Sequence, residues 1–206
     1  MIEAKDSYHH GDLRHGIIEE AKIWIETKDI SSLSLRGIAR RLGVSHNAPY
    51  RHFTDKESLL ATIAQIGFEK LEQSLQQVLA NNTSTPEERI KTLGVKYIEY
   101  AVSNPAYYRV MSSAYISNYQ KYPSLEKAAE ESFTILKEAI AQGQKARVIR
   151  SGDTKELASV CWSLVHGVSM LYLDRQIQAS TVDSVEKLAK LATAMMIEGL
   201  ELKKES

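Results

Sequence analysis

The 206-residue sequence lacks several features that would place it in other protein classes. Its single cysteine, Cys161, excludes an intramolecular disulfide. No apolar run reaches the ~20 residues of a membrane span, and the first ten residues lack the apolar core of a signal peptide. Lys and Arg together number 26, as do Asp and Glu, so the net charge is zero and the whole chain cannot coat nucleic acid. We expect a cytoplasmic protein without a membrane partner, in which any nucleic-acid contact comes from a local patch.

Catalytic and metal-binding motifs are also missing. The sequence contains no G-x-S-x-G, no phosphate-binding glycine loop and no H-E-x-x-H. His9, His10 and His15 lie near the start, but no Cys or carboxylate stands at a ligand-like spacing from them. Cys161 and His166 are five residues apart, roughly 140° around a helix, and therefore do not form a dyad. We predict no catalytic residue, no metal site and no cofactor.

Helical periodicity is what the sequence does contain, and no strand-like alternation accompanies it. A pattern of apolar residues runs from Asp55 to about Leu79, which predicts one helix about 37 Å long. Cap and proline signals predict further helix starts at Asp12, Thr85, Asn104, Ser124, Asp153 and Thr181. The sequence therefore predicts an all-α fold of about nine helices in two parts.

The stretch 34–56 carries a helix-turn-helix pattern. Apolar residues at 35, 38, 39 and 42 form one stripe, with Ser34 placed as N-cap and Gly43 as left-handed C-cap. Ser45 then begins a second short helix, whose first turn is expected to be irregular because Pro49 lacks an N–H. Between residues 31 and 56 there are five basic residues and one acidic residue, which makes a local cationic patch suited to phosphates.

The sequence LRGIARRLGVSHNAPYRHFTDKESLL at residues 35–60 resembles the DNA-binding signature of the tetracycline-repressor (TetR) family. YHHGDLR at residues 8–14 resembles the run that often precedes it. The resemblance implies an N-terminal three-helix DNA-binding domain over residues 8–70, with its core at 13–53 and the helix from 55 shared. It also implies a larger C-terminal helical domain over residues 71–206 for effector binding and dimerisation.

DNA contacts are expected mainly from the first turn of the second short helix. Asn pairs with adenine, His donates to guanine, and an Ala methyl suits the thymine methyl. Tyr50, Arg51, His52 and Lys56 are suited to phosphate contacts. The resemblance to the TetR family implies DNA contacts at the positions that match its signature. The predicted DNA-binding residues are Ser34, Arg36, Ser45, His46, Asn47, Ala48, Tyr50, Arg51, His52 and Lys56.

Aromatic and sulfur-containing residues gather in the C-terminal part. Three polar tips, on Tyr97, Tyr108 and His166, could orient a ligand in an apolar pocket. Spacing alone favours core residues whose polar atoms are satisfied locally, whereas the resemblance favours a pocket for a neutral or aromatic effector. NPAYYRVMSS and WSLVHGVSMLYLD also resemble a recurrent subset of TetR C-terminal domains. The ligand-binding candidates are Tyr97, Tyr108, Met111, Tyr115, Phe133, Trp162 and His166.

The helix expected at 153–174 is apolar on two sides, so both sides need cover. The sequence does not tell which face covers the monomer core, and a wholly intramolecular bundle stays open. A second copy of the chain would cover the other face and would present two recognition helices to two half-sites. The candidate dimer residues are Leu157, Val160, Leu164, Val168, Leu171, Leu188, Ala192 and Met195.

These patterns predict a transcriptional regulator that is not an enzyme. We expect a repressor that binds a palindromic operator in double-stranded DNA as a homodimer and is released by a small-molecule inducer. One alternative is an architectural DNA-binding protein without an effector, which should have no cavity of useful volume. Another is a helical carrier or enzyme in which the basic patch is incidental.

Overall fold

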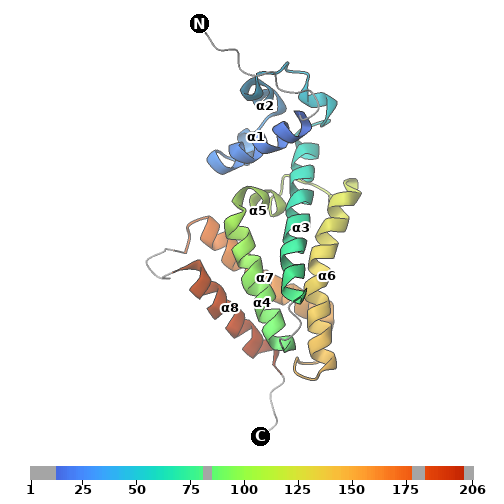
Figure 1. The fold of residues 1–206 in the computed structure, drawn as a ribbon, viewed down its shortest axis with the longest axis vertical. Coiled ribbons are helices and arrows are strands. Elements are labelled where there is room, and N and C mark those ends of the chain that lie inside the picture. Colours follow the sequence, from blue (N-terminus) through green and yellow to red (C-terminus); the bar gives the residue numbers. More distant parts are fainter. Residues whose placement is uncertain (1–12, 81–84, 178–183, 202–206) are drawn as a thin grey trace.

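The computed structural model describes residues 13–80, 85–177 and 184–201. These ranges form eight α-helices and three short 3₁₀ helices, and the only extended pairing among them is an isolated bridge between Ile149 and Glu201. The all-α prediction is confirmed. The two-part arrangement is plain in Figure 1, where a small unit stands above a larger helical body.

The small unit contains α1 (Leu13–Thr27), the 3₁₀ helix η1 (Ile30–Ser32), α2 (Leu35–Leu42) and the 3₁₀ helix η2 (Pro49–Arg51). As predicted, the Ser34 hydroxyl accepts a hydrogen bond from the Gly37 N–H at 3.1 Å. Gly43 ends α2 in the left-handed conformation, with φ of 68°. The predicted cap Asp12 lies outside the described residues.

Helix α3 (Lys56–Ala80) connects the two parts, because it starts beside the small unit and extends into the body (Figure 1). The Asp55 carboxylate accepts from the Ser58 N–H at 2.7 Å, and the Asp55 N–H donates to the Ser58 hydroxyl at 3.2 Å. This reciprocal cap fixes the start of the helix within one residue of the predicted position. The predicted long helix is confirmed.

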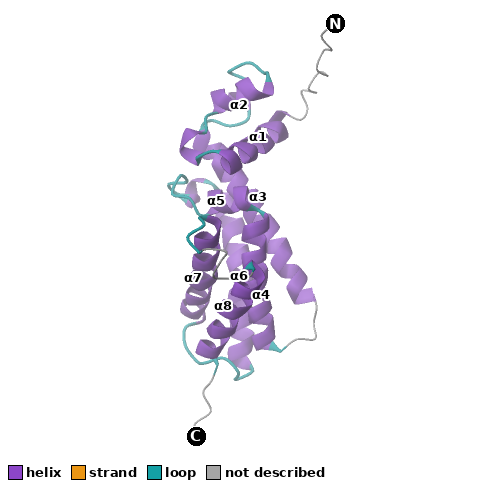
Figure 2. Ribbon diagram, turned by 90° about the vertical axis from the view of Figure 1, so that its left-hand side faces the viewer, coloured by secondary structure: helices purple, strands orange, loops and turns teal. Residues whose placement is uncertain are grey.

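Besides α3, the body contains α4 (Pro86–Ser103), α5 (Pro105–Met111), α6 (Pro123–Lys145), α7 (Thr154–Leu173) and α8 (Val185–Leu200) (Figure 2). The 3₁₀ helix η3 (Tyr119–Lys121) precedes α6. α3 packs against α4, α5 and α6, while α7 and α8 pack against each other and against α4. The body therefore has a layer around α3 and a second layer made of α7 and α8.

The predicted helix starts in the body are confirmed at Thr85, Asn104 and Asp153 and corrected at Ser124. Thr85 and Asp153 cap α4 and α7 with their side chains, as expected. Ser124 does not cap α6, because the N-cap is Tyr122, two residues earlier, and the helix begins at Pro123. The Asn104 amide donates back to the Tyr100 carbonyl at 3.0 Å and so leaves α5 without a side-chain cap. Position 181 lies outside the described residues, and Ser184 caps α8.

Candidate DNA-binding surface and effector cavity

The second helix of the helix-turn-helix is shorter than the sequence predicted. Most backbone bonds within residues 45–53 join residues three apart, such as Ala48 N–H to Ser45 C=O at 3.0 Å and His52 N–H to Pro49 C=O at 3.0 Å. The exception is the Phe53 N–H, which donates to the Pro49 C=O at 3.0 Å. Only η2 is regular, and it is a 3₁₀ helix. Because Pro49 has no N–H, the α-helical bond to Ser45 cannot form. The expected irregular first turn therefore extends over most of the predicted helix.

This segment nevertheless presents the predicted polar side chains to solvent. Tyr50 is 45% exposed, whereas Pro49 beside it is buried and anchors the turn. Ala48 is half-buried against the core of the unit, so its methyl is less available than predicted. The exposed members of the predicted set are Ser34, Arg36, Ser45, His46, Asn47, Tyr50, Arg51 and His52.

Basic side chains surround this segment. Arg36, Arg40 and Arg51 are exposed, in positions where phosphate oxygens can approach. Arg41 instead forms an ion pair with Glu20 of α1, and its guanidinium lies 5.5 Å from the centre of the Trp24 ring. Arg41 therefore joins α2 to α1.

Lys56 has an environment that the sequence did not indicate. Its ammonium donates to the carbonyls of Ile30 at 2.5 Å and Ser31 at 2.9 Å, and lies 4.9 Å from the centre of the Tyr115 ring. Burial lowers the pKa of Lys56 from its usual value. In this structure the side chain ties η1 and the loop after α5 to the start of α3. Its predicted phosphate contact stays a prediction.

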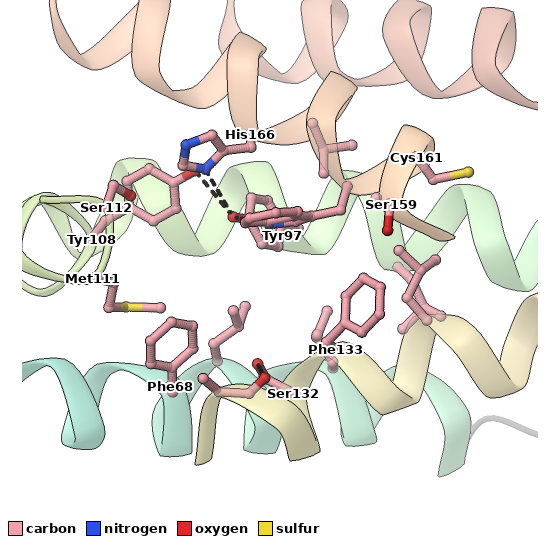
Figure 3. Close-up of a pocket in the computed structure, with 18 of the residues that line it drawn as sticks. Phe68, Tyr97, Tyr108, Met111, Ser112, Ser132, Phe133, Ser159, Cys161 and His166 are labelled. Carbon is pink, nitrogen blue, oxygen red and sulfur yellow. Dashed lines mark hydrogen bonds between the residues drawn. The ribbon is translucent and has the colours of Figure 1, made fainter. Parts of the chain in front are cut away.

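A cavity of about 520 Å³ lies inside the body and is bounded by side chains from α3 to α8 (Figure 3). Its walls are mainly aliphatic and aromatic, and it includes six of the seven predicted ligand-binding residues: Tyr97, Tyr108, Met111, Phe133, Trp162 and His166. Tyr115 is the exception, because it lines a separate cleft beside Lys56. A cavity of this volume is within the usual range of small-molecule sites.

The polar atoms at one end of the cavity form a connected cluster, the Tyr97–Tyr108–Trp162–His166 cluster. The Trp162 indole N–H donates to the Tyr97 hydroxyl at 3.1 Å. That hydroxyl lies 3.1 Å from the Tyr108 hydroxyl and 3.3 Å from His166 Nδ1, and the Tyr108 hydroxyl lies 2.7 Å from the same nitrogen (Figure 3). The polar atoms of these side chains are therefore hydrogen-bonded to one another, and the same side chains also line the cavity.

The titratable groups of the cavity favour their neutral forms. Burial raises the pKa of Tyr97 and Tyr108, and raises the pKa of the Cys161 thiol to about 11. Burial also lowers the pKa of His166. Of the described side chains that line the cavity, none is Asp, Glu, Lys or Arg. At neutral pH the cavity therefore carries no charge.

Several cavity residues were not identified from the sequence. They include Phe68, Leu71, Leu75, Tyr119, Ser132, Leu136 and Met196. The α3 residues among them were assigned to the apolar stripe of the long helix. That stripe faces both core and cavity, and the two environments use the same residue types, so no sequence signal separates them.

Comparison with known protein families identifies the family of this chain. Residues 17–63 match the family described as "Bacterial regulatory proteins, tetR family". Residues 90–196, more than half of the chain, match "Tetracyclin repressor-like, C-terminal domain". The chain belongs to the TetR family. It is therefore a DNA-binding transcriptional regulator of a family that is generally non-enzymatic.

Solved structures share the whole TetR architecture. A protein of unknown function from Rhodococcus sp. RHA1 is 26% identical, with a TM-score of 0.78 over 96% of this chain and 100% of that one. The TetR regulator PfmR from Thermus thermophilus is 20% identical, with a TM-score of 0.71 over 90% and 99%. The fatty acid degradation regulator FadR from Bacillus halodurans is 17% identical, with a TM-score of 0.72 over 91% and 99%. No curated protein matches the chain.

This TetR chain exposes one apolar face on α7 and α8. Val160 is 67% exposed, Met195 61% and Leu191 59%, and Leu164 and Leu171 lie on the same side of α7. Gly167 and Gly199 have open space where a side chain would stand. Leu191 was not predicted, whereas the predicted Ala192 is buried within the chain. The opposite face of α7, which includes Ala158 and Val165, covers the monomer core.

Helix α7 is also the only helix in the described part of the chain that is long and apolar enough to cross a membrane. Only 22% of that apolar window is buried inside the chain. A single such helix is weak evidence for a membrane span.

Proposed function

We propose that this TetR regulator is a repressor that binds a palindromic operator as a homodimer and leaves it when a small, uncharged effector fills the body cavity. The observation that carries the proposal is the cavity of about 520 Å³. Its wall includes residues of α5 and of the loop after α5, and both of these segments contact the DNA-binding unit or the start of α3. An effector there can act only through different contacts in the DNA-competent and DNA-incompetent arrangements.

The first connection to the DNA-binding unit runs through α5. Tyr108 and Met111 of α5 line the cavity, and Tyr107 beside Tyr108 lies 4.7 Å from the ammonium of Lys22 on α1. α5 also presses closely on α3, because a side chain at Gly67 would stand 2.6 Å from the Met111 sulfur. A shift of α5 therefore has to move α1 or α3.

The second connection is the loop after α5. Ser113 and Tyr119 line the cavity at the two ends of this loop. Between them, Ser117 donates from its hydroxyl to the Glu57 carboxylate at 3.0 Å and from its N–H at 3.3 Å. Glu57 is in the first turn of α3, next to Lys56. Effector contact with the loop can thereby reorient the start of α3, which follows the recognition segment directly.

The exposed apolar face of α7 and α8 supports the homodimer. Each chain would contribute this pair of helices to a four-helix interface about a two-fold axis, as symmetric pairing of one surface requires. Two recognition segments would then contact two half-sites of a palindrome. A partner chain would remove the large apolar side chains of this face from water. We take the compartment of this regulator to be the cytoplasm.

The alternatives have less support. An architectural DNA-binding protein without an effector is expected to lack a cavity of useful volume. The cavity of about 520 Å³ therefore counts against this alternative. The carrier or enzyme alternative leaves the family membership without a role. We assign DNA binding to residues 8–70 and effector binding with dimerisation to residues 71–206, with α3 shared between them.

Gel-shift titration of the purified chain with the DNA upstream of its own gene tests the proposal. We expect binding that weakens steeply with salt, a footprint with two-fold symmetry, and release by at least one uncharged compound from a library. Tyr50→Phe should weaken binding, because it removes an exposed hydroxyl from the recognition segment. Sequence-independent binding, or release by no compound that binds the body, would contradict the proposal.

A further inference from the structure

The cavity concentrates its adaptable hydrogen-bonding groups at one end. Ser113, Ser132 and Ser159 donate their hydroxyl protons to carbonyls three or four residues earlier in the chain at 2.8–2.9 Å. Tyr119 likewise donates to the Met111 carbonyl at 2.9 Å. These four hydroxyl protons are committed within the protein. Ser112, which also lines the cavity, lies beside Tyr108 and forms a side-chain hydrogen bond with it. The groups that can still change their hydrogen bonds to suit a ligand are therefore the Tyr97–Tyr108–Trp162–His166 cluster and the neighbouring Ser112.

The direction of the bonds in the cluster follows from which atoms can donate. An indole N–H only donates, so the Tyr97 oxygen accepts from Trp162. If His166 Nδ1 carries no proton, Tyr108 donates to it over the shorter distance of 2.7 Å, and Tyr97 donates either to Tyr108 at 3.1 Å or to the same nitrogen at 3.3 Å. Every hydroxyl proton is then used inside the cluster. In this arrangement the Tyr97 oxygen offers the ligand only a lone pair, which suits a hydroxyl donor.

The other neutral tautomer reverses the chain of bonds. With the proton on Nδ1, His166 donates to the Tyr108 oxygen at 2.7 Å, with the Tyr97 oxygen at 3.3 Å as a second acceptor, and Tyr108 donates to Tyr97. The Tyr97 proton is then available to the ligand, which suits a carbonyl acceptor. Proton movement between the two imidazole nitrogens thus lets one tyrosine oxygen serve either as acceptor or as donor.

Ionised groups have no counterpart in this cavity. Among the described side chains that line it there is no cation to pair with a carboxylate and no carboxylate to pair with an ammonium. Transfer of an unpaired ion from water into such a site is strongly unfavourable. The polar group of the ligand must therefore be both neutral and able to bond to a phenol oxygen.

We propose that the effector of this regulator is a largely hydrocarbon molecule whose single polar group is an alcohol or ketone oxygen bound to the Tyr97 hydroxyl. This inference rests on the proposed effector function of the cavity and specifies its ligand class. It also assigns Tyr97 as the residue that selects the polar group of the ligand.

Calorimetric titration with five naphthalene derivatives tests the inference. The probes are naphthalene, 2-naphthalenemethanol, 2-acetylnaphthalene, 2-naphthoate and 2-naphthylmethylammonium, each added to the purified full chain at pH 7.5. We expect the alcohol and the ketone to bind about 3–10-fold more tightly than naphthalene, since each gains one net hydrogen bond. The carboxylate and the ammonium should bind at least about tenfold more weakly than the alcohol.

The Tyr97→Phe variant should lose the preference for the alcohol and the ketone while it keeps naphthalene binding. Tyr115→Phe is the matched control, because it removes a tyrosine hydroxyl outside the cavity and should leave the ranking unchanged. The wild-type ranking needs no variant, so the inference remains testable even if Tyr97→Phe does not fold. Tightest binding of an ion, or an unchanged ranking in Tyr97→Phe, overturns the ligand class.

The same five probes added to the protein–DNA complex separate this inference from the proposed function. Release of DNA by the carboxylate or the ammonium alone would overturn the ligand class and leave an effector-responsive repressor. Tight binding of the alcohol and ketone without release would support the ligand class and contradict the effector role. Absence of binding by all five up to about 1 mM overturns the inference, and release by an unrelated compound would still preserve the function.

Discussion

Replacement of Leu191 and Met195 by Asp should dissociate the proposed dimer. Complete burial of a Leu or Met side chain stabilises by about 1.5–3 kcal/mol. These two are 59% and 61% exposed in the monomer, so cover by a partner recovers about 1 kcal/mol each. A two-fold interface contains both residues twice, so the four side chains together contribute about 4 kcal/mol to the free energy of dimerisation. Loss of this contribution corresponds to a rise in the dimer Kd of about 10³-fold.

Sedimentation velocity over a range of concentrations measures this shift, and gel-shift titration reports the accompanying loss of operator affinity. Ile23→Asp is the control, because Ile23 is 47% exposed on α1, outside α7 and α8. That variant should remain dimeric. A wild-type chain that sediments as a monomer at micromolar concentration, or a double variant that stays dimeric, would refute the assignment of the face.

Three further predictions follow from single side chains. Lys56→Met should lower the free energy of unfolding by about 1–3 kcal/mol in urea titrations, because it removes the bonds to the Ile30 and Ser31 carbonyls. Arg36→Ala should reduce the salt slope of DNA binding by about 1, and Lys56→Met should do the same if Lys56 also contacts phosphate as the sequence predicts. An equal loss of slope in both would mean that Lys56 contacts phosphate. Burial lowers the pKa of His166 below its ordinary 6.5, so the unfolded chain protonates first and stability should fall as the pH drops below about 6.5. The melting temperature should therefore fall more between pH 7.5 and 5.5 in the wild type than in His166→Gln, and equal falls would contradict this assignment. Gly43→Ala should cost about 1 kcal/mol in thermal unfolding through left-handed strain alone, since no atom lies within 4 Å of the added carbon; a loss several times larger would indicate a clash.

The helical scaffold was predictable because local signals agree with the final packing. The apolar stripe of α3 and the caps at Ser34, Thr85 and Asp153 act within one or two turns, and each of these caps is made as expected. The exposed polar residues around position 46 were predictable for the same reason. The family match reinforced a pattern that local chemistry already indicated.

The remaining features depend on contacts between distant parts of the chain. The Lys56 ammonium binds carbonyls 25 and 26 residues away, and no local pattern indicates that partnership. The cavity is formed where six helices fail to meet completely, so residues such as Phe68 look like ordinary core residues in sequence. On α8 the stripe was assigned to Ala192 where Leu191 is exposed, because a helical face is resolved only by its neighbours.

Helix α7 contributes Trp162 and His166 to the cavity and Val160 to the proposed contact between chains. Binding of an effector and association of two subunits would then share one rigid element, and each equilibrium would influence the other to an equal degree. If the chains pair through this helix, the concentration of effector needed for half-saturation should change with the amount of protein present. The cellular abundance of the regulator would in that case help to set the threshold at which it responds.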